Sequence, residues 1–138
     1  MRTLHLGLRV ADRDRSLTFY ATLGYEVVGE VPDTELGHLT MLKLPDDEFI
    51  TLELVHDPNG EAVTADTRLS HLVIQVESMD ATLAKLAADD IDAAAPTSPD
   101  GSNEFRTTWI SDPDGNRIEL VQWPTGHADG MTAADFAE

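Results

Sequence analysis

Apolar residues occupy every second position of several short runs in this chain. In Thr3–Val10 the apolar side chains alternate with His5, Gly7 and Arg9, which is the period of a β-strand. Apolar residues then recur at helical spacing from Leu17 to Leu23, after the N-cap candidate Asp12 and before Gly24, which fits the position just beyond a helix. Further strands are predicted over residues 25–31, 36–44 and 49–56.

The second half of the chain repeats this order. A strand is predicted over 69–76, a helix over 79–88 with an apolar stripe, a short strand near Ile91, and strands over 105–111 and 116–123. Asp112-Pro113-Asp114-Gly115 lies between the last two. It predicts a tight turn, because Pro presets φ at the second position and Gly tolerates the backbone that follows.

One offset of 66 residues superposes the two halves. His5 corresponds to His71, Glu53 corresponds to Glu119, and each Glu lies 48 positions after its His, from 5 to 53 and from 71 to 119. The offset is too long for an ordinary solenoid repeat and predicts two copies of one small module. We place the modules at residues 1–57 and 68–123, joined by a linker at 58–67 and followed by a mobile tail at 124–138.

The phase of the strands predicts where the four polar residues lie. His5 and His71 face away from the leucines of their strands, and Glu53 and Glu119 do the same. Since the leucine faces need helices as cover, the His and Glu side chains belong to the opposite side of the sheet. Each of them alone fits a polar residue on the solvent side of a strand. Four at matched positions favour a divalent metal site.

Composition narrows the classes of function. The chain has 138 residues, 41% of them hydrophobic, no cysteine, and a net charge of −17. Without thiolates, a metal site must use nitrogen and oxygen ligands. The negative charge argues against binding to nucleic acid or to anionic membrane surfaces. No apolar run approaches a membrane span and no signal-peptide pattern is present, so we expect a cytoplasmic protein.

The chain resembles the vicinal oxygen chelate superfamily, which includes glyoxalase I. The residues that carry the resemblance are H-L-G-L-R-V from His5, S-L-T-F-Y followed by L-G-Y, H-L-V-I-Q-V from His71, and D-P-D-G-N-R-I-E-L from Asp112. It covers roughly residues 1 to 123. It implies an α+β fold in which two βαβββ modules form a curved mixed sheet around a metal-binding cleft.

Within that superfamily a fourth ligand at Glu53 points to glyoxalase I. The resemblance implies that one divalent metal ion is bound by His5, Glu53, His71 and Glu119, with nickel or cobalt favoured and zinc or manganese also compatible. It implies the isomerisation of a thiol hemithioacetal of a 2-oxoaldehyde, such as methylglyoxal, to a 2-hydroxyacyl thioester. Glu119 is the favoured general base and Glu53 its partner.

The resemblance specifies the substrate and the oligomeric state less closely than the metal site. Arg9 falls where the family anchors a substrate carboxylate, and Arg106 supplies a second cation for a small-molecule substrate. Asp57 stands where glyoxalase I has an Asn near glutathione, so another thiol remains open. The resemblance implies a homodimer, although relatives also close the site within one chain.

Two other functions fit the same fold. An epimerase of the methylmalonyl-CoA type would share the enolate chemistry, but the chain has no cluster of Lys and Arg for the CoA phosphates. A non-catalytic drug- or metabolite-binding protein would leave the two Glu without a role. His38, His56 and His127 have no partner in the repeat, and we expect them to be surface or loop residues.

Overall fold

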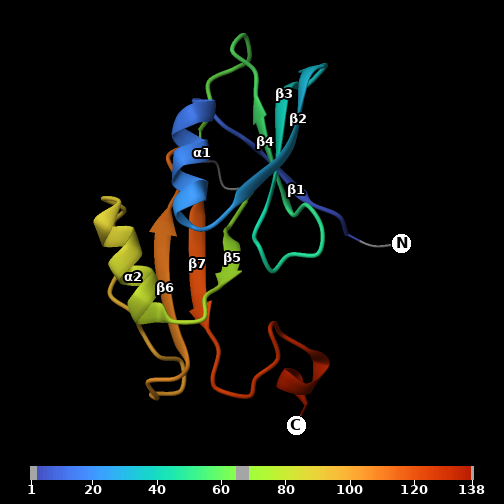
Figure 1. The fold of residues 1–138 in the computed structure, drawn as a ribbon. Coiled ribbons are helices and arrows are strands. Elements are labelled where there is room, and N and C mark those ends of the chain that lie inside the picture. Colours follow the sequence, from blue (N-terminus) through green and yellow to red (C-terminus); the bar gives the residue numbers. More distant parts are fainter. Residues whose placement is uncertain (1–2, 65–68, 138) are drawn as a thin grey trace. The chain divides into compact units, whose positions relative to one another are not determined.

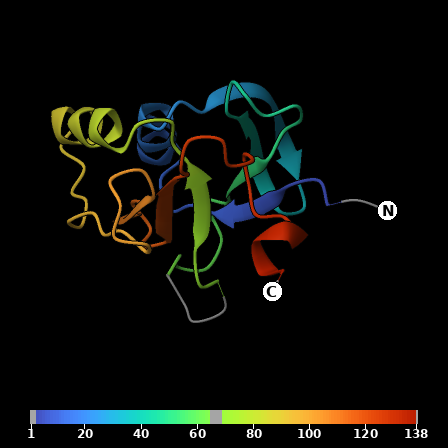
Figure 2. The same ribbon diagram turned by 90° about the horizontal axis from the view of Figure 1, so that it is seen from below.

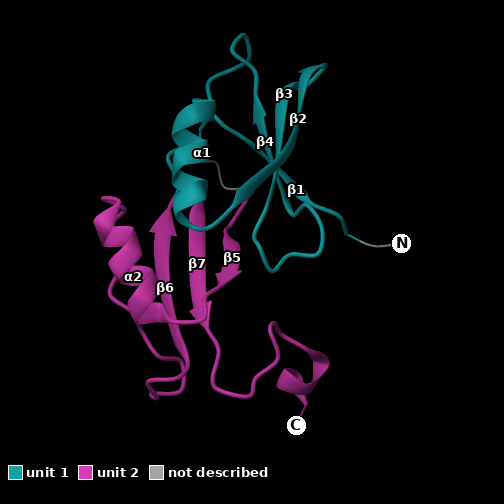
Figure 3. Ribbon diagram, in the orientation of Figure 1, with its two compact units in different colours: residues 1–66, 112–115 teal, residues 67–111, 116–138 magenta. Residues whose placement is uncertain are grey.

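The computed structural model describes residues 3–64 and 69–137. The chain divides into two compact units, residues 1–66 with 112–115 and residues 67–111 with 116–138 (Figure 3). The division after residue 66 falls inside the predicted linker at 58–67, whose last three residues lie outside the described ones. Each unit has its own sheet, and each sheet has one helix on one of its faces (Figure 2).

The first unit has the predicted βαβββ order (Figure 1). Its elements are β1 (Leu6–Arg9), α1 (Arg13–Thr22), β2 (Glu26–Thr34), β3 (Gly37–Lys43) and β4 (Leu52–His56). The sheet order is β1-β4-β3-β2, with β1 parallel to β4 and the other pairs antiparallel. Parallel pairing of β1 and β4 requires a long connection, which the helix and the β2–β3 pair provide.

Helix α1 begins and ends where the sequence predicts. The Asp12 side chain accepts a hydrogen bond from the backbone N–H of Arg15 at 3.0 Å, which satisfies one of the free donors of the first turn. Gly24 has φ +104° just after the C-cap, a conformation in which a Cβ would be strained. The helix covers the face of the sheet that carries Leu42, Leu52 and Leu54, each only 1% exposed.

The predicted turn at 112–115 is confirmed, and it belongs to the first unit. The Gly115 N–H donates to the Asp112 carbonyl at 3.0 Å. The Tyr20 hydroxyl donates to Asp112 Oδ2 at 2.7 Å in a buried environment. Burial, reinforced by the Asp112 carboxylate, raises the pKa of Tyr20 far above its ordinary value. Asp114 Oδ1 accepts from the Ala11 N–H at 3.2 Å, so the turn is hydrogen-bonded to the segment that joins β1 and α1.

The second unit has a smaller sheet. Its elements are β5 (Leu72–Gln75), α2 (Met79–Ala88), β6 (Arg106–Ser111), β7 (Arg117–Gln122) and the 3₁₀ helix η1 (Ala133–Phe136). The sheet order is β5-β7-β6, with β5 parallel to β7 and β6 antiparallel to it. The bounds predicted for α2 agree with the structure, and its N-cap is Ser78.

The strand predicted near Ile91 is wrong, and the second module is therefore βαββ. The chain after Ile91 runs beside β6 but makes only scattered contacts with it: the Ala94 N–H donates to the Trp109 carbonyl at 3.0 Å, and Thr97 forms an isolated bridge with Thr107. Pro96 has no N–H to donate to a ladder, and alanines have low strand propensity. These two properties explain why the ladder does not form.

The segment after β7, predicted as a mobile tail, forms defined local contacts in its described part. Besides η1, its Asp129 accepts a hydrogen bond from Gln75 Nε2 at 3.2 Å, and the His127 ring stacks on Trp123 with centroids 4.4 Å apart. Among the helices of residues 3–64 and 69–137, none combines the length and apolarity that crossing a bilayer requires.

Candidate metal-binding pairs

His5 and Glu53 lie next to each other on the first sheet, as the strand phase predicts. His5 immediately precedes β1, and the parallel register places Gly7 opposite Glu53 on β4. His5 Nε2 lies 3.6 Å from Glu53 Oε1. The side chain of Glu53 is 14% exposed, so its carboxylate is partly withdrawn from water.

His71 and Glu119 repeat this arrangement in the second unit. His71 immediately precedes β5, and the register places Val73 opposite Glu119 on β7. His71 Nε2 lies 3.5 Å from Glu119 Oε2, and the Glu119 side chain is 23% exposed. Both pairs therefore consist of a residue just before an edge strand and a carboxylate on the parallel neighbour, two register positions further along.

The separation in both pairs, 3.6 and 3.5 Å, is slightly longer than that between two donors of one metal ion. Hydrogen bonds from nitrogen to oxygen are usually about 2.7–3.2 Å long, and both pairs are longer than that. Donors about 2.1 Å from one metal lie about 3.0 Å apart in adjacent octahedral positions and about 3.4 Å apart in tetrahedral ones. Imidazole nitrogen with carboxylate oxygen is a suitable donor set for divalent transition metals.

In the first unit, a glycine makes room for the carboxylate. A Cβ added to Gly7 would lie 3.1 Å from Glu53 Oε2. The absence of a side chain at Gly7 therefore lets the carboxylate approach the backbone of β1 closely. The corresponding residue of the second unit is Val73, which is 49% exposed.

In the second unit, neighbouring side chains orient the imidazole. The Ser70 hydroxyl lies 2.9 Å from His71 Nδ1, so Nε2 is the ring nitrogen that faces Glu119. A hydrogen bond to the distal nitrogen is the usual way in which a ligating histidine is oriented. The His71 ring also meets Trp109 edge-on, with centroids 5.0 Å apart. Ser70 was not predicted from the sequence, although it directly precedes His71.

The two predicted substrate-binding arginines have different surroundings. Arg9 ends β1 on the same strand face as Gly7 and is exposed. Arg106 shares its strand face with the buried Thr108 and Ile110, opposite to Trp109, which pairs with Glu119. Arg106 Nη1 instead donates to Asp80 Oδ1 of α2 at 2.7 Å. The structure thus places Arg106 on the helix-covered face, away from the His71–Glu119 pair.

The structure brings the four predicted ligands together as two pairs. Within residues 3–64 and 69–137, no three His, Asp or Glu side chains form a group that could hold a metal ion.

Comparison with known proteins identifies the family. The family model of the Glyoxalase/Bleomycin resistance protein/Dioxygenase superfamily matches residues 2–120. The chain belongs to this superfamily. The lactoylglutathione lyase of Escherichia coli O157:H7 is 26% identical over 125 residues, which cover 88% of this chain and 93% of that protein. The enzyme of the same name from Haemophilus influenzae is 28% identical over 125 residues, with the same coverage.

Solved structures of the glyoxalase superfamily share the α+β fold. A trypanothione-dependent glyoxalase I of Leishmania major superposes with a TM-score of 0.72 at 29% identity, covering 88% of this chain and 86% of that one. TnmS3, an antibiotic-binding protein from Streptomyces, superposes with a TM-score of 0.68 at 21% identity, covering 91% and 98%. The second likeness concerns the fold alone. The fold class predicted from the sequence is confirmed.

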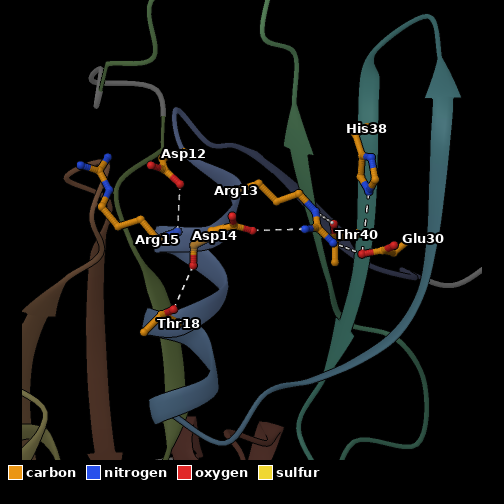
Figure 4. Close-up of polar contacts among 8 residues, drawn as sticks. All are labelled: Asp12, Arg13, Asp14, Arg15, Thr18, Glu30, His38 and Thr40. Atoms are coloured by element: carbon orange, nitrogen blue, oxygen red, sulfur yellow. Dashed lines mark hydrogen bonds and ion pairs between the residues drawn. The ribbon is translucent and has the colours of Figure 1, made fainter.

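The histidines outside the repeat have contacts of their own within this glyoxalase-fold chain. His38 lies on β3 with Nε2 buried and 3.8 Å from Glu30 Oε1, and that atom makes no hydrogen bond within the described residues (Figure 4). Arg13 of α1 forms an ion pair with the same Glu30 and donates to Thr40 Oγ1 at 3.1 Å. His38 is thus part of a polar network between α1 and the sheet, with its side chain 27% exposed.

His127 is held by two oxygen acceptors. Its Nδ1 lies 2.7 Å from the Ala128 carbonyl and its Nε2 lies 2.7 Å from Asp135 Oδ1. Because both partners can only accept, both ring nitrogens carry a proton when both bonds form, which requires the imidazolium. Hydrogen bonding to the Ala128 carbonyl and then to Asp135 raises the pKa of His127 above its usual range.

Proposed function

We propose that this protein is a glyoxalase I-like, metal-dependent isomerase that converts a thiol hemithioacetal of a 2-oxoaldehyde into a 2-hydroxyacyl thioester. The observation that carries the proposal is the duplicated His–Glu pair, with the same register and nearly the same separation in both units. The curated relatives named lactoylglutathione lyase support the same reaction class.

The proposed metal site uses both His–Glu pairs, because one pair alone supplies too few ligands. A catalytic metal site keeps about three protein ligands and an open position, and each pair supplies two donors. His5, Glu53, His71 and Glu119 together would supply four ligands and leave positions for substrate on an octahedral ion. A divalent ion held there, with nickel or cobalt favoured and zinc or manganese compatible, would act as a Lewis acid that stabilises the enediolate oxyanion.

The side chains of the chain would move the proton and position the substrate. Glu119 would take the proton from the carbon that bears sulfur and return it to the adjacent carbon, so that one carboxylate serves first as base and then as acid. Glu53 would be its partner carboxylate. His5 and His71 would remain fixed ligands, and Arg9, exposed on the face of His5, would bind a substrate carboxylate.

Turnover in defined metal forms tests this function. The purified protein would be loaded in turn with nickel, cobalt, zinc and manganese, and assayed with hemithioacetals of methylglyoxal and several thiols. Tight binding of a ligand without turnover in any metal form would contradict the isomerase and favour a binding protein. Activity only on acyl-CoA esters would favour the epimerase.

The role of Glu119 has its own test. We expect Glu119→Gln to lower kcat by about 100-fold or more while the protein still binds metal. Glu77→Gln, an exposed carboxylate of the same unit, is the matched control and should keep full activity. Undiminished turnover of metal-loaded Glu119→Gln would rule out the assignment of the base.

We further propose a homodimer. Sedimentation equilibrium of the metal-loaded protein measures its mass directly. A mass of one 15.1 kDa chain would contradict the dimer, whereas the metal-to-chain ratio tests the ligand set independently of the assembly.

A further inference from the structure

Arg117 is a cation without an anionic partner in a strongly acidic chain. Three of the seven basic side chains that the structure describes pair with carboxylates: Arg13 with Glu30, Arg15 with Asp114 at 3.8 Å, and Arg106 with Asp80. The guanidinium of Arg117 makes no hydrogen bond or ion pair to any described residue. Its guanidinium carbon instead lies 4.1 Å from the centroid of the Trp109 ring.

Arg117 lies on the strand face that carries the second His–Glu pair. It precedes Glu119 by two positions on β7, so both side chains leave the same face. Trp109 is the register partner of Glu119 on β6, and its ring meets His71 edge-on at 5.0 Å. Arg117, Trp109 and the His71–Glu119 pair therefore form one continuous group on this face.

Stacking prepares the guanidinium for a planar anion. An arginine that lies over an indole uses its flat face for the ring and keeps the N–H donors along its edge. Those donors match the two oxygens of a carboxylate in a bidentate hydrogen bond. Because the ring already restricts the side chain, binding costs less conformational entropy than it would for a free arginine.

The first unit has no equivalent of this group. At the offset of 66, Arg117 corresponds to Thr51, whose hydroxyl donates to Asp47 Oδ2 at 2.7 Å. The register partner of Glu53 is Met41 rather than a tryptophan. The duplicated metal ligands therefore have unequal neighbours, and a ligand that contacts both pairs would meet Arg117 on one side only.

We propose that Arg117, held by Trp109, binds a carboxylate of the substrate beside His71 and Glu119, so that the enzyme prefers carboxylate-bearing hemithioacetals. This inference rests on the proposed function for its reaction, but not for its binding site. The carboxylate can come from the thiol or from the oxoaldehyde. Repulsion by the net charge of −17 alone predicts the opposite preference, for neutral substrates.

The thiol half is tested with one matched pair of substrates. Hemithioacetals of methylglyoxal with glutathione and with glutathione diethyl ester differ only in their carboxylates. We expect kcat/KM to favour the acid, and Arg117→Gln to reduce the acid-to-ester ratio about tenfold or more. Arg117→Lys should restore part of it, since the charge returns without the planar fork. Lys85→Gln removes an exposed cation on α2 and should leave the ratio unchanged.

The oxoaldehyde half is tested with a neutral thiol. N-acetylcysteamine is combined with methylglyoxal or with 4,5-dioxopentanoate, which carries a carboxylate on the carbonyl component. If Arg117→Gln lowers the ratio of kcat/KM for the acid over the neutral substrate with these oxoaldehydes only, the carboxylate that Arg117 binds belongs to the oxoaldehyde. Ratios that Arg117→Gln leaves unchanged in both arms would overturn the inference.

A binding measurement separates this inference from the proposed function. The chain has two tryptophans, so Trp123→Phe leaves Trp109 as the single fluorescent reporter beside Arg117. S-methylglutathione and 4-oxopentanoate are each titrated against their ethyl esters. If no hemithioacetal is turned over but at least one acid quenches Trp109 more strongly than its ester, and Arg117→Gln abolishes the difference, the reaction is wrong and the inference stands. No preference for either acid would overturn it.

Discussion

Gly7 shows how one residue without a side chain shapes the first His–Glu pair. Its backbone lies opposite Glu53 in the parallel register, and a Cβ there would lie 3.1 Å from the carboxylate oxygen. A contact of that length is shorter than ordinary van der Waals contact between carbon and oxygen. The end of the Glu53 side chain, rather than the strand, would move to relieve it.

We therefore expect Gly7→Ala to weaken metal binding by about tenfold with little loss of folding stability, because displacement of a ligating carboxylate lowers affinity more than stability. Competition titration with a metal-binding dye measures the affinity. Gly29→Ala is the matched control, since no heavy atom lies within 4 Å of its Cβ position on β2. An equal effect of the two substitutions would contradict this account of Gly7.

At the scale of elements, the turn at 112–115 is attached to α1 through Tyr20. The tyrosine is fully buried and donates to the Asp112 carboxylate at 2.7 Å. Hydrogen bonds to charged groups contribute about 1.5–3 kcal/mol, and their loss leaves a buried acceptor less well satisfied.

We expect Tyr20→Phe to lower the free energy of unfolding by about 2 kcal/mol, measured by urea denaturation. Tyr25→Phe is the control, because the Tyr25 hydroxyl makes no hydrogen bond within the described residues. Burial raises the pKa of Tyr25 to about 12, with Asp47 a smaller cause. If both variants lose the same stability, the Tyr20–Asp112 bond is not the attachment.

The C-terminal segment contains a second attachment that depends on pH. His127 stacks on Trp123 and bonds Asp135 of η1. Its pKa is raised in the folded state above the ordinary 6.5, so the contribution of this contact is complete below pH 6.5 and disappears as the pH rises through the higher folded value. The Thr132 N–H and then His127 lower the pKa of Asp135, so that carboxylate stays charged throughout this range.

We expect amide exchange in residues 132–137, corrected for its intrinsic pH dependence, to accelerate as the pH rises above the raised pKa of His127. Hydrogen-exchange mass spectrometry follows the segment directly. His127→Gln should exchange faster at low pH and lose the pH dependence. A dependence that persists in this variant would assign it to another group.

At the scale of the whole molecule, two units with separate sheets each contribute one His–Glu pair. A ligand that binds only the folded protein at 100 times its Kd stabilises it by about 2.7 kcal/mol. The proposed four-ligand site makes this stabilisation depend equally on both units.

We expect nickel or cobalt to raise Tm by several degrees, and His5→Ala and His71→Ala to abolish the increase to a similar extent. Calorimetry with and without a chelator measures this change. His56→Ala, outside the repeat, should retain the increase. Loss of the metal effect in only one of the two ligand variants would contradict a shared site.

Strand phase explains why much of the fold and of the site could be predicted. The period of two in a strand assigns His5 and Glu53 to one face of the sheet, whatever packs on the other face. The caps Asp12 and Gly24 define the two ends of α1 through local backbone chemistry. The same rule of strand phase shows what was missed: Arg117 is in phase with Glu119 on β7, whereas Arg106 is out of phase with Trp109, the partner of Glu119 on β6. The prediction of a strand near Ile91 was wrong because it rested on alternation alone and did not consider that Pro96 interrupts a ladder.

The sequence by itself determined the order of elements apart from the strand near Ile91, the repeat and the faces of the four candidate ligands, because these depend on periodicity and local caps. Only the tertiary structure decided the distances within each His–Glu pair, the ion pair that occupies Arg106, and the stacking of Arg117 on Trp109. Those contacts join residues on different strands and helices. Their geometry depends on register and packing, which no local pattern specifies.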